Sequence, residues 1–201
     1  MSMKIASEGY NLGTWGNISR RFDENIFAIT PSAIPYKEMS EEHIVIVDLN
    51  CNVIEGNKKP STEILLHSEI YRLKKKANAV IHTHGVFSTS FAIARKPIPA
   101  VCEDLIQVVG GYVNIADYHL PATKELAAAA IIALAERSAC LLANHGLVSV
   151  AGNLAEAFKI TQIVEKSAQA IILAQALGGA VELSIADINK MRNFYLEKYG
   201  K

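Results

Sequence analysis

Short β-type runs follow one another directly in the first half of the chain, and this order is the strongest constraint on the fold. Three runs, at residues 18–20, 26–30 and 43–48, are separated by loops that carry Gly, Pro, Asn and Ser. Strands that succeed each other without an intervening helix favour antiparallel pairing. The sequence therefore predicts an α/β fold with a mixed or antiparallel sheet covered by helices, and argues against a pure β-α-β winding.

Helical and strand patterns alternate through the rest of the chain. Between residues 61 and 76, Leu66, Ile70 and Leu73 recur at helical spacing and predict one buried stripe. Further helices are expected at residues 123–137, 153–177 and 184–199, and buried strands at residues 79–83, 113–116, 139–143 and 147–150. No low-complexity linker, charge block or internal repeat interrupts the sequence, so residues 1–201 are expected to form a single domain.

Composition and charge argue against several classes of partner. The 20 basic residues are balanced by 20 acidic ones, so no surface for nucleic acid is expected. No uninterrupted apolar run of about 18 residues is present, and we expect no membrane-spanning segment. The N-terminus lacks the apolar core of a signal peptide, and the three cysteines are odd in number and widely spaced. These features predict a cytoplasmic protein in a reducing compartment.

Two histidines two residues apart are the sharpest local signal. His82 and His84 lie at the end of a predicted strand, where residues two apart point to the same face and can bind one metal ion. A catalytic zinc site needs a third protein ligand and one open position. The best candidate is His145, which follows a second buried strand and precedes Gly146, a residue that allows a sharp turn. Ordinary buried or surface histidines remain the alternative. The contexts of the other three, His43, His67 and His119, are weaker.

Glu63 is the candidate general base. It lies in the first turn of the helix that follows Pro60, where a carboxylate also interacts favourably with the helix dipole, so a purely structural role is the alternative. Near a metal ion, the same carboxylate could move protons to and from a carbon beside a polarised carbonyl.

Three turns rich in glycine and hydroxyl groups are candidates for binding an anion. They are residues 13–17, residues 30–33, and Ser61 with Thr62 at a helix N-terminus, where backbone N–H groups favour anions. Ordinary turns and caps explain each segment equally well without a ligand. Neither a P-loop nor a Rossmann glycine pattern is present, which disfavours nucleotide binding.

Taken in order, these segments resemble the class II aldolase/adducin family, and within it the fuculose-phosphate aldolase-like members. Five segments carry the resemblance, which extends over nearly the whole chain from about Gly9 to Lys201: residues 13–19, 29–32, 59–63, 82–84 and 144–146. The resemblance implies a three-layer α/β/α domain with a central, largely antiparallel sheet. It also implies Zn²⁺ on His82, His84 and His145, and an acid/base role for Glu63.

The same resemblance implies further site residues and an assembly. The positions that match the family's phosphate-binding residues, with Thr14 beside them, are Gly16, Asn17, Ser32, Ser61 and Thr62. Members of the family are usually homotetramers with active sites between subunits. Their C-terminal tyrosine reaches a neighbouring site, and Tyr199 before Gly200 matches it.

Two positions in the sequence depart from the family pattern. Where fuculose-phosphate aldolases have a tyrosine just beyond a Pro-Ala pair, Pro99-Ala100 is followed by Val-Cys-Glu-Asp. Glu103 or Asp104 replaces that group, or the two residues begin a surface helix. Ala33 also occupies a position where glycine is usual.

The predicted function is retro-aldol cleavage of a small ketose 1-phosphate into dihydroxyacetone phosphate and an aldehyde. A 4-epimerase of pentulose phosphates, or a dehydratase of a methylthio-pentulose phosphate, would use the same kind of site. A non-enzymatic, adducin-like interaction module is a further alternative, although it would need neither the three histidines nor Glu63. A three-histidine zinc hydrolase would leave the three anion-binding turns unexplained.

Overall fold

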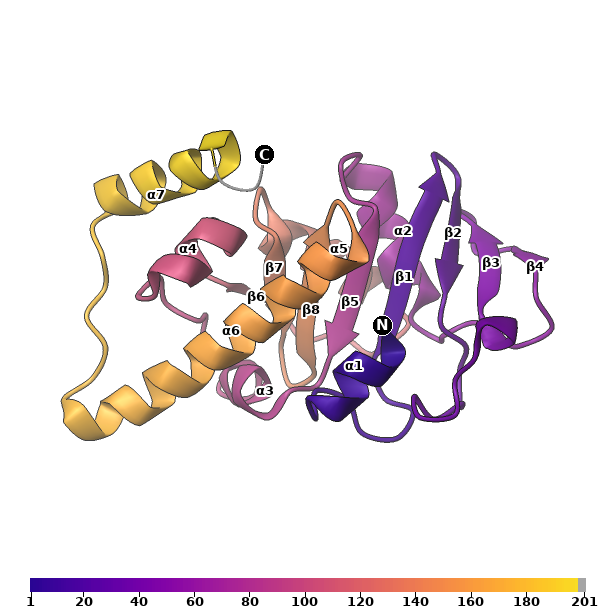
Figure 1. Ribbon diagram of the computed structural model, residues 1–201, viewed down its shortest axis with the longest axis horizontal. Coiled ribbons are helices and arrows are strands. Elements are labelled where there is room, and N and C mark those ends of the chain that lie inside the picture. The colour runs from indigo at the N-terminus through magenta and orange to yellow at the C-terminus, as the bar shows by residue number, and fades with distance from the viewer. Residues whose placement is uncertain (199–201) are drawn as a thin grey trace.

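The computed structural model describes residues 1–198 and contains one eight-stranded sheet with helices on both faces (Figure 1). Tyr199 lies outside the described residues. Strand order across the sheet is β4-β3-β2-β1-β5-β8-β7-β6. The strands are β1 (Asn17–Asp23), β2 (Ile26–Ile29), β3 (Val45–Asp48), β4 (Val53–Glu55), β5 (Ala79–Thr83), β6 (Asn114–Ala116), β7 (Ala139–Leu142) and β8 (Gly146–Ala151).

Nearly all neighbouring strands pair antiparallel, as the uninterrupted succession of strands in the first half of the sequence predicts. The exception is the β6–β7 pair, which is parallel. The helix α5 (Lys124–Leu134) lies between these two strands in the sequence and provides the crossover that parallel pairing requires. The expectation of an α/β fold with a largely antiparallel sheet is confirmed.

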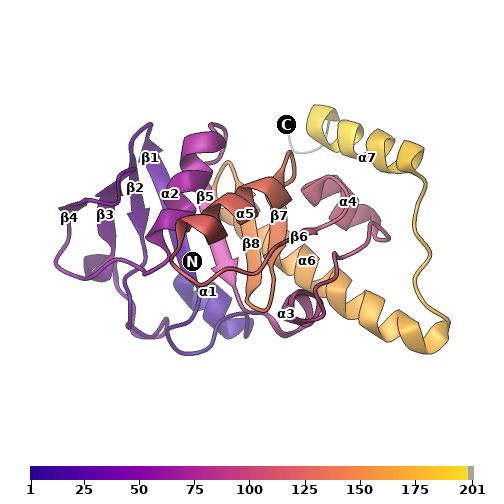
Figure 2. The same ribbon diagram turned by 180° about the vertical axis from the view of Figure 1, so that it is seen from behind.

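Helices cover both faces of the sheet and complete the three layers (Figures 1 and 2). On one face, α2 (Ile64–Leu73) and α5 (Lys124–Leu134) pack into a large apolar cluster. On the other, α6 (Leu154–Ala174) packs with α1 (Ser2–Ser7), α3 (Val86–Ile93) and α4 (Glu103–Val109). The last helix, α7 (Ile185–Lys198), lies against α4 after an extended segment.

The two faces of β5 show how the sheet positions the site. All five residues of this central strand are buried. Val80 joins the cluster under α2 and α5, whereas Ala79 and Ile81 join the cluster under α1 and α6. Since side chains alternate between faces, the even-numbered residues of β5 and its continuation point toward α2. His82 and His84 therefore share the face on which Glu63 and α2 lie.

Two short helices and one strand were not expected from the sequence: α1, α3 and β4. Residues 86–93 contain Val, Phe, Thr and two serines, which have weak helix propensity, so tertiary packing against α6 stabilises α3. The helix expected from residue 61 begins at Ile64, because residues 61–63 form a turn.

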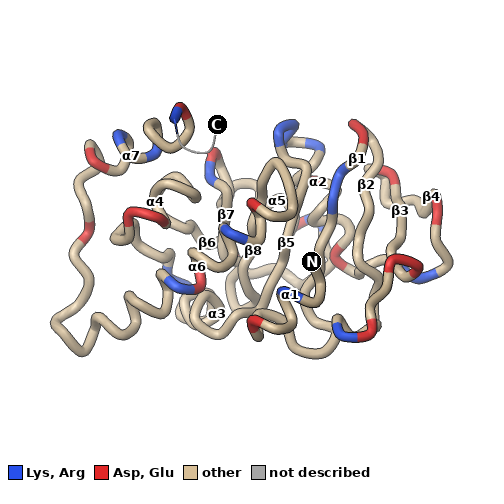
Figure 3. Tube along the Cα trace, in the orientation of Figure 1, with Lys and Arg blue, Asp and Glu red and all other residues tan. Residues whose placement is uncertain are grey.

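Charge is distributed over the whole molecule. Figure 3 shows basic and acidic residues interspersed along the chain, in line with the zero formal net charge. Within residues 1–198, no helix combines the length and the apolar character that crossing a membrane requires. The three cysteines are all free thiols.

Candidate metal centre

The hairpin between β7 and β8 brings His145 to the end of β5. β8 pairs with β5 so that Val148 lies opposite His82 and Leu147 opposite Thr83. His145 lies in the tight turn just before β8, where its N–H donates to the Leu142 carbonyl at 3.0 Å. The third histidine thus reaches the first two from a segment about 60 residues away in the sequence.

Gly146 makes this close approach possible. A Cβ atom at residue 146 would lie 2.3 Å from the Thr83 carbonyl oxygen and 2.9 Å from Cδ2 of the His84 ring. Both distances are too short for any side chain, and the closer atom belongs to the backbone and cannot swing aside. Only glycine therefore allows the turn to press against the end of β5.

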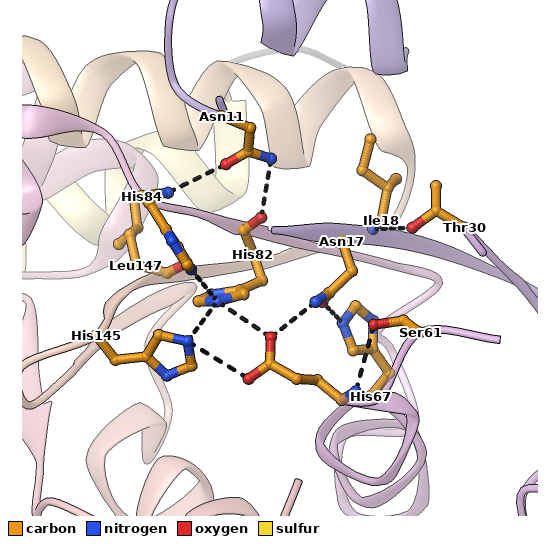
Figure 4. Close-up of polar contacts among 11 residues, drawn as sticks. Asn11, Asn17, Ile18, Thr30, Ser61, His67, His82, His84, His145 and Leu147 are labelled. Carbon is orange, nitrogen blue, oxygen red and sulfur yellow. Dashed lines mark hydrogen bonds and ion pairs between the residues drawn. The ribbon is translucent and has the colours of Figure 1, made fainter. Parts of the chain in front are cut away.

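The three imidazoles converge through their Nε2 atoms (Figure 4). Nε2 of His82 lies 2.8 Å from Nε2 of His84 and 3.2 Å from Nε2 of His145. One ligand atom from each ring lies within 4.8 Å of the other two. The structure thus brings together the three histidines that the sequence singled out, at a spacing that could hold one metal ion.

Hydrogen bonding and burial prepare these rings to bind a cation. Nδ1 of His82 donates to the Leu147 carbonyl at 2.9 Å, which leaves the Nε2 lone pair facing the cluster. Burial, followed by the neighbouring His145, lowers the pKa of His82 to about 3. Burial, followed by His82 and His145, lowers the pKa of His84 to about 3. Both rings are therefore unprotonated at neutral pH, as metal ligands must be.

Glu63 lies directly beside the three rings. Its Oε2 is 3.3 Å from Nε2 of His82, and its Oε1 is 3.6 Å from Nε2 of His145. Although Glu63 precedes α2, its side chain makes no capping hydrogen bond to that helix. Instead, Oε2 accepts a hydrogen bond from Nδ2 of Asn17 at 2.7 Å. Among the described residues Oε1 has no hydrogen-bond partner, although it is buried. The carboxylate thus contacts the histidine cluster and Asn17, and it does not cap α2 through a side-chain hydrogen bond.

The turns singled out from the sequence gather at the same end of the sheet. Asn17 lies opposite His82 in the β1–β5 pair. The Ser61 N–H donates to the Thr30 carbonyl at 3.1 Å, and Ser32 Oγ donates to the Pro60 carbonyl at 2.8 Å, so the second and third turns adjoin. Two further candidates, Thr14 and Thr62, are exposed. Ala33 has a φ of 61°, a left-handed conformation that explains why glycine suits this position.

Asn11 is a structural neighbour of the site that the sequence did not reveal. Its Oδ1 accepts a hydrogen bond from the His84 N–H at 3.1 Å, and it is almost fully buried. Gly16, with a φ of 77°, packs so closely that a Cβ atom there would lie 2.2 Å from Asn11 Nδ2. The glycine turn and the end of β5 are thus connected through one amide. No local pattern marks Asn11, because its partners are distant in sequence.

Glu103 and Asp104 occupy the first turn of α4. Asp104 forms an ion pair with Lys166 on α6, and Glu103 is exposed. They begin a helix, which was one of the two alternatives that the sequence left open.

Fold and site together define a class of protein: an α/β/α domain with a three-histidine centre and an adjacent acid. The profile of the Class II Aldolase and Adducin N-terminal domain matches residues 1–172. The chain therefore belongs to the class II aldolase and adducin family, as the sequence motifs indicated, and it is an enzyme of the aldehyde-lyase type.

Individual relatives agree with this membership. The chain is 39% identical over 201 residues to 5-deoxy-D-ribulose 1-phosphate aldolase of Bacillus thuringiensis serovar kurstaki, covering 98% of this chain and 92% of the relative. It is 37% identical over 175 residues to L-fuculose phosphate aldolase of Escherichia coli strain K12, covering 87% of this chain and 80% of the relative. A solved structure of an L-fuculose 1-phosphate aldolase superposes with a TM-score of 0.93 at 38% identity, covering 97% of this chain and 92% of that one.

Proposed function

We propose that this protein is a zinc-dependent aldolase that cleaves a small ketose 1-phosphate into dihydroxyacetone phosphate and an aldehyde. The observation that carries the proposal is the position of Glu63, whose Oε1 is buried without a hydrogen-bond partner among the described residues, 3.6 Å from Nε2 of His145. A carboxylate kept open beside three converging imidazoles suits proton transfer next to a polarised carbonyl. The names of the relatives, both aldolases of sugar phosphates, support the substrate class.

The chemistry follows from the donor set. Bound by His82, His84 and His145, zinc would polarise the substrate carbonyl and stabilise the negative charge that develops during cleavage. When the carbon–carbon bond breaks, its electron pair stays on the carbon beside that carbonyl, and the hydroxyl of the departing half loses its proton to become the aldehyde. Glu63 takes up this hydroxyl proton and delivers it to the carbon beside the carbonyl, which completes dihydroxyacetone phosphate. The reaction moves one proton and needs neither oxidant nor reductant.

The proposed phosphate site is the group of turns at the edge of the metal centre. The adjoining Ser32 and Ser61, and the N-terminus of α2, provide hydroxyl and N–H donors that suit an anion. Asn17 directs both polar atoms of its side chain toward Glu63 and His67, so its proposed contact is through the main chain. The full proposed set is Thr14, Gly16, Asn17, Ser32, Ser61 and Thr62.

Assembly as a homotetramer in the cytoplasm is part of the proposal. A single chain leaves Leu177, Val181 and Ile185 highly exposed between the end of α6 and the start of α7, and exposed apolar groups of this kind commonly lie in interfaces. The family resemblance assigns Tyr199 to a neighbouring active site. The three free cysteines are compatible with a reducing compartment.

Two other outcomes would use the same residues. Epimerisation at carbon 4 of a pentulose phosphate, or dehydration of a methylthio-pentulose phosphate, also needs a polarised carbonyl and a proton-transferring group. Product analysis separates the three reactions, because only the aldolase yields dihydroxyacetone phosphate. A non-enzymatic module is disfavoured by the convergence of three imidazoles and a carboxylate.

The test is a screen of ketose 1-phosphates with purified, zinc-loaded protein. The substrates include 5-deoxyribulose 1-phosphate and fuculose 1-phosphate, and dihydroxyacetone phosphate is measured by coupled reduction. We expect cleavage that is abolished by chelation and restored by zinc. Conversion of a substrate to an isomer or to a dehydrated product, with no dihydroxyacetone phosphate, would replace the aldolase assignment with one of its alternatives.

Glu63→Gln tests the acid directly. The substitution retains the size of the side chain and removes its ability to exchange a proton, so we expect turnover to fall by on the order of 10²–10⁴. Metal content and melting temperature should change little. Turnover close to that of the wild type would exclude the proposed proton transfer.

A further inference from the structure

A buried chain of hydrogen bonds leads from the interior of the protein to Glu63. The Tyr71 hydroxyl lies 2.7 Å from Ser19 Oγ, which lies 2.6 Å from Nδ1 of His67. Nε2 of His67 lies 2.5 Å from Oδ1 of Asn17, and Nδ2 of Asn17 donates to Oε2 of Glu63. Figure 4 shows Asn17 beside His67. The four residues before Glu63 are each at most 3% exposed, so water does not compete for these bonds.

The spacing of these residues along the sequence explains why this chain of hydrogen bonds can form. Glu63, which directly precedes α2, and His67 and Tyr71 within it recur every four residues and therefore line up along one side of the helix. Asn17 and Ser19 are two residues apart and share one face of β1. Four residues of helix rise about 6 Å and two residues of strand about 6.6 Å. The two elements thus present their polar groups at nearly equal intervals, and each group meets the next.

The direction of every bond in the chain follows from elementary donor and acceptor chemistry. The Glu63 carboxylate only accepts, so Asn17 presents its N–H₂ to it and its oxygen to His67. That oxygen also only accepts, so Nε2 of His67 carries the proton. Full burial lowers the pKa of His67 to about 3, so the ring is neutral and Nδ1 accepts from Ser19. Tyr71 then donates to Ser19. All four donors point toward Glu63.

We propose that His67 is a positioning residue for Glu63, acting through Asn17. The chain holds Oε2 with a defined donor and leaves Oε1 directed at the metal centre, where a proton must be exchanged. This inference rests on the proposed function for its kinetic consequence, although the direction of the hydrogen bonds can be measured without any substrate. A merely structural network would contribute to stability and would not govern turnover in particular.

The kinetic test compares His67→Leu with His67→Gln. Leucine removes the donor to Asn17, whereas the amide of glutamine can restore it. We expect His67→Leu to lower kcat by on the order of 10²-fold, because a small misplacement of an acting group has an effect of that size. KM should change less than about threefold and zinc content should stay near that of the wild type, since the phosphate turns and the three metal ligands are retained. His67→Gln should recover most of kcat.

Thr161→Val is the matched control. Thr161 Oγ1 donates to Ser149 Oγ at 3.0 Å in an equally buried pair that has no connection to Glu63. Loss of this hydrogen bond should lower the free energy of unfolding and leave kcat unchanged. A kcat in Thr161→Val as low as that of His67→Leu would show that general destabilisation is the cause and would overturn the proposal, as would a His67→Leu variant with normal kcat.

A second measurement needs no activity and no substituted protein. Long-range ¹H–¹⁵N spectra of histidine-labelled wild-type protein should show His67 as the neutral tautomer with its proton on Nε2. A proton on Nδ1 alone, or a charged ring, would reverse the direction of the chain and overturn the proposal. If the wild type cleaves no ketose 1-phosphate while this tautomer is found, the proposed function fails and the hydrogen-bond chain stands.

Discussion

The three candidate metal ligands differ in how firmly each ring is held. His82 is oriented by its hydrogen bond to the Leu147 carbonyl. The backbone of His84 is held by Asn11, and its ring lies beside exposed Trp15, with ring centroids 6.1 Å apart. Nδ1 of His145 is buried and has no hydrogen-bond partner among residues 1–198. The first two rings are therefore pre-positioned on a strand, and the third depends on the turn that carries it.

At this scale we predict that His84→Ala loses most of its bound metal. Because two imidazoles cannot replace the three protein ligands of a catalytic zinc site, occupancy should fall from close to one ion per chain to a small fraction. Elemental analysis after dialysis measures the ratio. His119→Ala, which removes a histidine outside the cluster, should bind as much metal per chain as the wild type does. Full occupancy in His84→Ala would show that these residues are not the ligands.

At the scale of secondary-structure elements, Glu165 connects α6 to the helix that follows the metal-binding strand. Its carboxylate accepts hydrogen bonds from the N–H groups of Phe87 at 2.7 Å and Ser88 at 3.0 Å, at the N-terminus of α3. Gly85 packs against it so closely that a Cβ atom there would lie 2.6 Å from the carboxylate carbon. A side chain 80 residues away in the sequence thus caps the helix that begins just after His84.

We therefore predict that Glu165→Ala lowers the free energy of unfolding by about 2–3 kcal/mol, because two N–H groups lose a charged partner. Urea unfolding at fixed protein concentration measures the change. Gln169→Ala, at an exposed position of the same helix, should alter the free energy by less than about 0.5 kcal/mol. Equal stability of the two variants would mean that packing alone holds α3.

At the scale of the whole molecule, the proposed tetramer decides where the active site is completed. The last described helix, α7, follows the long α6 helix in the sequence and packs against α4 (Figures 1 and 2). The residue that the family resemblance assigns to a neighbouring site, Tyr199, follows directly after this helix in the sequence. Under this assignment, loss of Tyr199 and loss of a metal ligand are defects of two different subunits.

Subunit mixing tests this assignment. Tyr199→Phe alone should lower turnover without loosening the oligomer. When inactive His84→Ala subunits are exchanged with Tyr199→Phe subunits, some interfaces join an intact metal centre to an intact tyrosine, so activity should exceed that of either parent. Sedimentation and mass measurements establish that exchange has occurred. Activity that stays at the parental level in exchanged oligomers would show that each site is completed within one chain.

Much of this architecture was predictable from the sequence, because the relevant signals are local. Hydrophobic spacing and turn residues located most strands and the long helices, and the direct succession of strands predicted the largely antiparallel sheet. The spacing of His82 and His84 determined that they share one face of β5 and its continuation. Short elements such as α3 were missed, since their local propensity is weak and packing stabilises them.

Only the tertiary structure decided which distant residues meet. His145 reaches β5 because Gly146 removes a clash with Thr83, a contact 63 residues away that no local pattern encodes. His67 was assigned no role from its sequence context, yet α2 and β1 pack in the one register that joins it through Asn17 to Glu63. Periodicity determines the face on which a side chain lies, whereas the packing of the whole core determines what stands opposite that face.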